Sequence, residues 1–164
     1  MSGMQSLKRA SDSRSRFTRR RSRSSILEID FWMLSKIQAI SQLVGRLMRL
    51  IEGSQCVQGA EFDIELALRE ALANAVIHGN REDPETKVHI RCCCGPGKEI
   101  SIVVTDQGKG FDFEKLAGFG LMSDPPSEDG RGILLMKAYM DEVRFERGGS
   151  EVHMRKRLRT ASRS

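Results

Sequence analysis

The stretch that decides the fold is residues 65–80, ELALREALANAVIHGN. Its apolar residues recur at every third or fourth position, which predicts an amphipathic helix over about residues 63–78. Glu70, Asn74 and His78 follow one another at intervals of four, so on a helix they form a polar row beside the apolar stripe. Such a row can line a cleft; the alternative is an ordinary polar helix edge.

The polar row offers oxygen ligands of the kind that Mg²⁺ prefers. A carboxylate from Glu70 and an amide oxygen from Asn74 suit a hard cation that keeps several of its waters. Near such a metal, Glu70 can alternatively accept a proton from an attacking hydroxyl group.

A second polar segment, VVTDQGKGF, covers residues 103–111 and follows a predicted strand. Asp106 at the end of that strand can accept a hydrogen bond from an exocyclic amine. Gly108 and Gly110 lack a Cβ atom, so the backbone there can approach a flat ring closely. Alone, this Asp-x-Gly-x-Gly pattern is a weak signal, because many turns contain it.

A third segment, residues 128–143, reads EDGRGILLMKAYMDEV and places Gly130, Arg131 and Gly132 at the start of a helix predicted over about residues 132–140. The N–H groups at a glycine-rich helix start form an anion site, and phosphate is its usual occupant. Each segment is weak alone. Their order, and their placement on these elements, together predict a split nucleotide site.

The rest of the chain predicts an α+β fold. A short strand over Ser25–Asp30 precedes a helix that runs to about Ile51, with Asp30 as its N-cap and Met33 at the start of its apolar stripe. Four further strands are expected over about residues 87–93, 99–105, 142–146 and 151–158. This order predicts an α/β two-layer sandwich, in which a mostly antiparallel mixed sheet carries about three helices on one face.

The net charge of +5 hides an uneven distribution. Residues 1–25 hold eight basic residues and one acidic residue, residues 155–164 hold five basic residues, and residues 26–154 hold 14 basic and 21 acidic residues. The body of the chain is therefore acidic, which argues against nucleic-acid binding through a folded basic face. We expect a disordered Ser/Arg-rich leader over residues 1–24, a folded domain over residues 25–158 and a basic tail over residues 159–164.

The leader is either a tether for RNA, a membrane surface or an acidic partner, or a solvated extension without a role. No apolar run approaches the ~20 residues that span a bilayer, and none follows the basic N-terminus as in a secretory signal, so we expect a cytoplasmic protein. Cys92, Cys93 and Cys94 are consecutive and lack the spacing of a zinc site, and we expect them to be reduced and packed in a strand.

Together the three segments closely resemble the N, G1 and G2 boxes of the histidine-kinase-like ATPase superfamily, which has the Bergerat fold. Within it, the pattern Glu-Ala-x-x-Asn-Ala-x-x-His-Gly over residues 70–79 resembles the anti-sigma-factor serine/threonine kinases. The ending Met-x-x-Tyr-Met-Asp-Glu-Val over residues 136–143 and the short chain resemble the same family. The resemblance covers about residues 25–158 and does not reach the leader.

The resemblance implies a role for each residue of the first two segments. Asn74 would ligate a Mg²⁺ ion that bridges the phosphates of ATP. Glu70 would be the general base, or would orient the nucleophile. Asp106 would hydrogen-bond the adenine amino group, with Gly108 and Gly110 shaping the pocket around the base.

It also implies a phosphate-binding end of the site. Gly130, Arg131 and Gly132 would hold the phosphates under a lid formed by about residues 112–129. Arg131 is not a fixed residue of the family pattern, so its flanking glycines carry this expectation. His78 stands where sensor kinases often have a basic residue, and it is either a phosphate contact or a structural residue.

Kinases of this family use ATP and Mg²⁺ to phosphorylate a serine or threonine of a small anti-anti-sigma protein with a STAS domain. They also sequester a sigma factor, usually as homodimers, so the resemblance implies these cofactors, partners and state. One alternative is a non-catalytic module in which ATP only selects a binding partner. Another is a detached sensor-kinase ATPase domain, which is disfavoured because the helix predicted over residues 31–52 contains no histidine.

Overall fold

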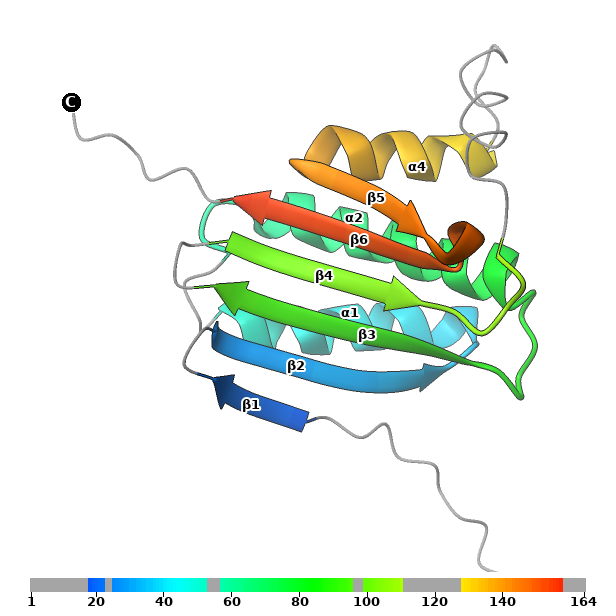
Figure 1. Ribbon diagram of the computed structural model, residues 1–164, viewed down its shortest axis with the longest axis horizontal. Coiled ribbons are helices and arrows are strands. Elements are labelled where there is room, and N and C mark those ends of the chain that lie inside the picture. Colours follow the sequence, from blue (N-terminus) through cyan, green and yellow to red (C-terminus); the bar gives the residue numbers. More distant parts are fainter. Residues whose placement is uncertain (1–17, 23–24, 53–56, 96–98, 111–127, 158–164) are drawn as a thin grey trace, which may run out of the picture.

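The computed structural model describes residues 18–22, 25–52, 57–95, 99–110 and 128–157. Six strands form one sheet in the order β1-β2-β3-β4-β6-β5, and every neighbouring pair among them is antiparallel (Figure 1). The strands are β1 (Thr18–Ser22), β2 (Ser25–Leu34), β3 (Lys87–Gly95), β4 (Glu99–Thr105), β5 (Glu142–Glu146) and β6 (Glu151–Arg157).

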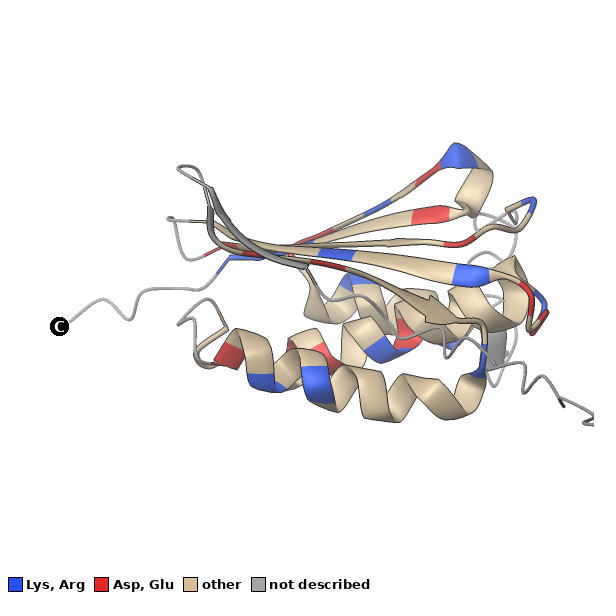
Figure 2. Ribbon diagram, turned by 90° about the horizontal axis from the view of Figure 1, so that it is seen from below, with Lys and Arg blue, Asp and Glu red and all other residues tan. Residues whose placement is uncertain are grey.

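Helices cover one face of the sheet and leave the other face open (Figure 2). In the described part of the chain they are α1 (Ile37–Glu52), α2 (Glu61–Asn74) and α4 (Glu128–Tyr139). Helix α2 packs against both α1 and α4, and it continues directly into a π-helical turn, Ala75–Gly79. The predicted α+β two-layer sandwich is confirmed.

The core between sheet and helices follows from two periodicities. On β3 and β4 every second side chain is buried, as expected for strands with one covered face. On α1 the buried positions recur every three to four residues, from Ile40 to Ile51. Fully buried side chains come from every layer and include Phe31, Ile64, Leu68, Ile90, Ile102 and Ile133. Burial of each contributes about 1.5–3 kcal/mol.

The segment from Asp30 to Met33 belongs to a strand, so the predicted helix start is wrong. β2 runs to Leu34 and α1 begins only at Ile37. Asp30 is therefore not an N-cap; its Oδ1 lies 2.8 Å from Nε2 of His89 on the open face of the sheet. The apolar spacing around Met33 fits both a helix and a strand, and pairing with β3 selects the strand.

Strand β1 differs from the disordered leader expected over residues 1–24. Thr18–Ser22 pair antiparallel with β2 at the edge of the sheet. Such pairing uses backbone hydrogen bonds, so it does not need the apolar side chains whose scarcity suggested disorder. The other leader residues, the tail over residues 159–164 and the predicted lid up to residue 127 lie outside the described residues.

The cysteine run lies on β3, with Cys92 and Cys94 buried and Cys93 on the open face. Cys92 and Cys93 are free, as expected, and burial raises the pKa of the Cys92 thiol to about 12. Cys94 is disulfide-bonded, so the expectation of a reduced thiol is wrong there. Among the described helices, none has the length and apolarity needed to cross a bilayer.

Candidate active site

Glu70, Asn74 and Gly132 face one another where α2 packs against α4. A Cβ atom added to Gly132 would lie 2.6 Å from Oε2 of Glu70 and 3.7 Å from Oδ1 of Asn74. Two members of the predicted polar row therefore line the space between two helices instead of facing bulk water. The missing side chain at Gly132 leaves that space open.

Asn74 is the last residue of α2 and is only 8 % exposed. Its Nδ2 has no hydrogen-bond partner among the described residues. A buried amide left unpaired costs about 1–3 kcal/mol, so such a group in a cleft points to a ligand that satisfies it. The amide offers Oδ1 as a metal ligand and Nδ2 as a donor to a phosphate oxygen or a metal-bound water, which fits Mg²⁺ with a polyphosphate.

The carboxylate of Glu70 is the candidate proton acceptor. Partial burial raises the pKa of Glu70 above its ordinary value, because desolvation disfavours the charged form. In the described part of the chain, no ion pair joins Glu70 to a basic group. A carboxylate with these properties holds a proton more readily than a solvated one, which suits it to general base chemistry.

Asp106 follows β4 directly and lies against the π-helical turn. Its side chain is buried, and a Cβ atom added to Gly79 would lie 2.4 Å from Oδ2 of Asp106. Oδ1 accepts a hydrogen bond of 2.8 Å from the backbone N–H of Gly108. Burial raises the pKa of Asp106, and the Gly108 bond offsets only part of that rise. The carboxylate is thus a buried acceptor at the end of a strand.

Gly108 and Gly110 bring the loop after β4 into backbone contact with two neighbouring elements. A Cβ atom at Gly108 would lie 1.9 Å from the carbonyl oxygen of Gly79. A Cβ atom at Gly110, where φ is 76°, would lie 2.1 Å from the carbonyl oxygen of Gly148. Both glycines are therefore required by packing of the loop itself, in addition to the expected approach to a ligand ring.

Comparison with known proteins decides the family. Residues 34–156 match the histidine kinase-like ATPase domain, which is most of the folded part. This chain belongs to the histidine kinase-like ATPase family.

Similar curated proteins include two kinds of bacterial regulator. The anti-sigma F factor of Clostridium novyi (strain NT) is 33% identical over 103 residues, which cover 60% of this chain and 71% of that protein. The serine-protein kinase RsbW of Bacillus subtilis (strain 168) is 33% identical over 134 residues, which cover 75% of this chain and 83% of that protein. The predicted family and the predicted enzyme class, an ATP-dependent protein serine/threonine kinase, are confirmed.

In this histidine kinase-like ATPase domain the polar row changes its geometry after Asn74. From Ala75 to Gly79 the helix is π-helical, so the 100° per residue that aligned His78 with Glu70 and Asn74 no longer applies. His78 lies half-buried on this turn. π-Helical turns are frequent at functional sites, and this one places Gly79 against Asp106.

The glycines of the third segment lie inside α4 and not ahead of it. The helix begins at Glu128, four residues before the predicted start, so Gly130 and Arg131 belong to its first turn and Gly132 follows that turn. Only the first four N–H groups of a helix lack a partner within it. Gly132 leaves space beside Glu70, and its expected contact with phosphate stays a prediction.

A hydrogen-bonded connection that was not predicted from the sequence anchors the loop after β4. Oδ1 of Asn80 accepts a bond of 2.8 Å from the N–H of Gln107, and Nδ2 of Asn80 donates to the carbonyl oxygen of Lys87 at 3.0 Å. Oε1 of Gln107 in turn accepts a bond of 2.6 Å from the N–H of Lys87. Asn80 is buried, and its position after a helix-ending glycine was the available signal.

Proposed function

We propose that this domain binds ATP with Mg²⁺ and transfers the γ-phosphate to a serine or threonine of a STAS-domain anti-anti-sigma protein, and that it also binds a sigma factor. The observation that carries the proposal is the buried, unpartnered Nδ2 of Asn74 beside Glu70, in the space left by Gly132 among the described residues. The names of two relatives support this proposal. The name serine-protein kinase supports phosphate transfer to a protein serine, and the name anti-sigma F factor supports a sigma factor as a partner.

Two residues of α2 would have separate roles in phosphate transfer. When bound, ATP with Mg²⁺ supplies the phosphoryl group and positive charge near the phosphates. Oδ1 of Asn74 would hold the metal, and Glu70 would take the proton of the attacking hydroxyl group. The raised pKa of Glu70 supports this role, since a base works best when its pKa approaches the working pH.

Three residues would hold the base of the nucleotide. Asp106 would accept a hydrogen bond from the adenine amino group, and burial would strengthen that bond. Gly108 and Gly110 would shape the wall of the base pocket through their backbone contacts. At the other end, Gly130, Arg131 and Gly132 at the start of α4 would lie near the phosphates, and His78 would reach them from the π-helical turn.

The partners follow from the same proposal. We infer that the domain acts as a homodimer in the cytoplasm, where anti-sigma regulators meet sigma factors. The basic leader, residues 1–24, would add contact with an acidic partner, and its described part, Thr18–Ser22, is an edge strand of the sheet.

The proposal is tested by separating binding from transfer. ATP with Mg²⁺ should raise the melting temperature of the wild-type chain, and Asn74→Ala should remove this shift because it removes the metal ligand. Glu70→Gln should keep the shift but lower transfer of radiolabelled phosphate to a purified STAS-domain anti-anti-sigma protein by about 10²–10⁴-fold. Glu65→Gln is the matched control, because Glu65 lies on the same helix and pairs with Arg69 at the surface.

Each arm has an outcome that contradicts one part of the proposal. An Asn74→Ala chain that ATP with Mg²⁺ still stabilises fully would remove Asn74 from the metal site. Equal labelling by the Glu70→Gln and Glu65→Gln variants would remove Glu70 as the base. A wild-type chain that binds ATP and labels no STAS protein would leave a nucleotide-dependent binding module as the function.

A further inference from the structure

The loop that carries Asp106 rests on the turn between β5 and β6. The backbone N–H of Asp106 donates to the carbonyl oxygen of Ser150 at 2.9 Å. Four residues further along the chain, Gly110 lies so close to Gly148 that an added Cβ atom would come within 2.1 Å of the Gly148 carbonyl oxygen. The position of this turn therefore sets the position of Asp106 and of the loop.

The turn holds one residue, Arg147, in a backbone conformation that a residue with a side chain does not favour. Three consecutive residues, Arg147, Gly148 and Gly149, have φ values of 52°, 67° and 92°. For Arg147 this left-handed conformation costs roughly 1–2 kcal/mol, because its Cβ crowds the backbone. Local bonds from Ser150 to the carbonyl oxygen of Arg147, at 3.0 Å from Oγ and 3.5 Å from N, close the turn. Contacts from outside the turn are needed to hold Arg147 in this conformation.

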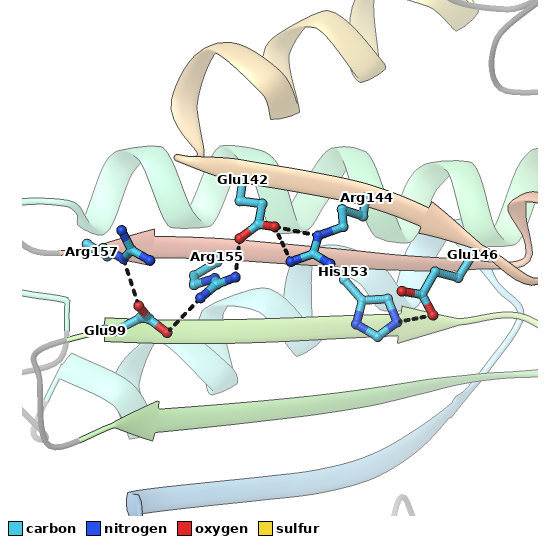
Figure 3. Close-up of polar contacts among 7 residues, drawn as sticks. All are labelled: Glu99, Glu142, Arg144, Glu146, His153, Arg155 and Arg157. Carbon is cyan, nitrogen blue, oxygen red and sulfur yellow. Dashed lines mark hydrogen bonds and ion pairs between the residues drawn. The ribbon is translucent and has the colours of Figure 1, made fainter.

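Glu151 supplies such contacts from the first position of β6. Its Oε2 accepts a hydrogen bond of 2.9 Å from Oγ1 of Thr105, and it lies 3.7 Å from Nη1 of Arg147. Its Oε1 lies 2.7 Å from Nε2 of His153. The same nitrogen lies 3.5 Å from Oε2 of Glu146, and Figure 3 draws this contact between His153 and Glu146. The side chain of Glu151 is only 11% exposed.

The connection reaches the nucleotide loop through Thr105. This residue is the last of β4, pairs with Glu151 across the sheet and directly precedes Asp106. Burial raises the pKa of Glu151, but hydrogen bonds from His153 and Thr105 outweigh it, so the net pKa is lowered and the group is charged at neutral pH. Bonds to a charged acceptor are stronger than neutral ones. The Glu151 carboxylate thus contacts Thr105, which precedes Asp106, and Arg147, which belongs to the turn that contains Ser150.

We propose that Glu151 is a positioning residue for nucleotide binding, which holds Thr105 and the β5–β6 turn in register so that Asp106 meets the base. The proposal rests on the nucleotide site proposed above and adds a residue on the opposite face of the sheet. Glu151 acts through Thr105 and the turn, and it does not touch the nucleotide.

The experiment measures the affinity of the full chain for fluorescent analogues of ATP and ADP. Thr105→Val removes only the hydroxyl group that bonds to Glu151, and Glu151→Ala removes the carboxylate. Thr105→Val should weaken binding by about three- to tenfold, the effect of losing one hydrogen bond. Glu151→Ala should weaken it at least as much, because it also removes the contacts with His153 and Arg147. The loss should be equal for ATP and ADP, because the disturbed contact lies at the base and not at the γ-phosphate. Thr105→Ser, which keeps the hydroxyl, should restore binding to within about twofold of wild type.

A matched control lies at the other end of the same two strands. Glu99 pairs with Arg155 and Arg157 on the open face, far along β4 from the loop (Figure 3). Glu99→Gln should leave nucleotide affinity unchanged. Unchanged affinity in Thr105→Val, with only a lower melting temperature, would overturn the positioning role while leaving the nucleotide site intact. A wild-type chain that binds neither analogue would overturn the nucleotide site itself.

Discussion

Carboxylates on the two sides of the sheet have pKa values shifted in opposite directions. On the helix-covered side, burial raises the pKa of Glu70 and of Asp106, and no basic group among the described residues pairs with either. On the open face, burial also acts on Glu142 and Glu151, but hydrogen bonds and charges from neighbouring side chains outweigh it and lower the pKa of both. Figure 3 shows this second arrangement around Glu142.

The direction of the pKa shift indicates whether a carboxylate serves ligand chemistry or the stability of the fold. A buried carboxylate without a cationic partner destabilises the folded chain at neutral pH, so its presence calls for a functional reason. A carboxylate whose pKa is lowered by ion pairs contributes to the stability of the charged, folded state. Changes on the covered side should therefore reduce function, and changes at Glu142 on the open face should cost only a small amount of stability. Glu151, also on the open face, is linked to the nucleotide site through its bond to Thr105.

The largest expected effect comes from filling the space beside Glu70. Gly132→Ala places a Cβ atom 2.6 Å from Oε2 of Glu70, and the flexible carboxylate must move away. Phosphate transfer to a STAS-domain protein should fall by about 10²-fold or more, the contribution of a positioned general base. Unfolding free energy should change by less than about 1 kcal/mol, because alanine favours a helix.

Gly45→Ala is the matched control for this substitution. Gly45 also lies inside a helix, α1, and an added Cβ atom would meet only Nη1 of Arg49, at an ordinary 3.8 Å. This variant should gain about 0.5–1 kcal/mol of stability and keep full transfer activity. Full activity in Gly132→Ala as well would show that the carboxylate of Glu70 need not stand where the structure places it.

A smaller effect is expected from Asp106→Asn, which should weaken ATP binding by about 10–100-fold, the range for one hydrogen bond to a charged group. The same variant should be more stable without nucleotide. Because the pKa of Asp106 is raised in the folded state, its stabilising contribution is present at low pH and is lost as pH rises through that pKa. Asparagine does not titrate, and its Oδ1 can still accept the bond from Gly108.

Thermal melts of both chains from acid to neutral pH test whether Asp106→Asn is the more stable chain. The melting temperature of Asp106→Asn should exceed that of wild type increasingly as pH rises from about 4 to 7. A variant that is less stable than wild type at neutral pH would show that Asp106 serves the fold, and the distinction between the two sides of the sheet would not hold there.

Elements whose pattern lies within one short segment of the sequence could be predicted. The periodicity over residues 63–78 predicted α2 together with the polar positions Glu70 and Asn74, and the run over residues 99–105 predicted β4. Turn glycines predicted the hairpin of β5 and β6. In each case a single element contains the whole signal.

The remainder depends on contacts between distant segments. The π-helical turn adds one residue to a helical turn over only five residues, too short a stretch for its period to show. The bond between Asn80 and Gln107 joins residues 27 positions apart, and that between Thr105 and Glu151 joins residues 46 apart. β1 forms because a neighbouring strand offers its backbone. Such pairings between distant segments leave no local pattern in the sequence, so only the folded structure shows them.

The smallest expected effect concerns Glu142 on the open face. Its side chain accepts hydrogen bonds from Arg144 and Arg155, and these outweigh desolvation and lower its pKa below the ordinary value of 4.5. Its stabilising contribution is therefore present above about pH 4.5 and is lost as pH falls through the lowered pKa. Glu142→Gln should lower the melting temperature near neutral pH by less than about 2 °C, because the pairs are exposed to solvent.

The pH dependence of Glu142→Gln should run opposite to that of Asp106→Asn. The difference from wild type should close as the solution is acidified, and 1 M salt at neutral pH should also shrink it by screening the pairs. Nucleotide affinity should be unchanged, since Glu142 lies on β5 away from the loop of Asp106. A loss of ATP binding in this variant would show that the open face and the nucleotide site are coupled more widely than through Glu151.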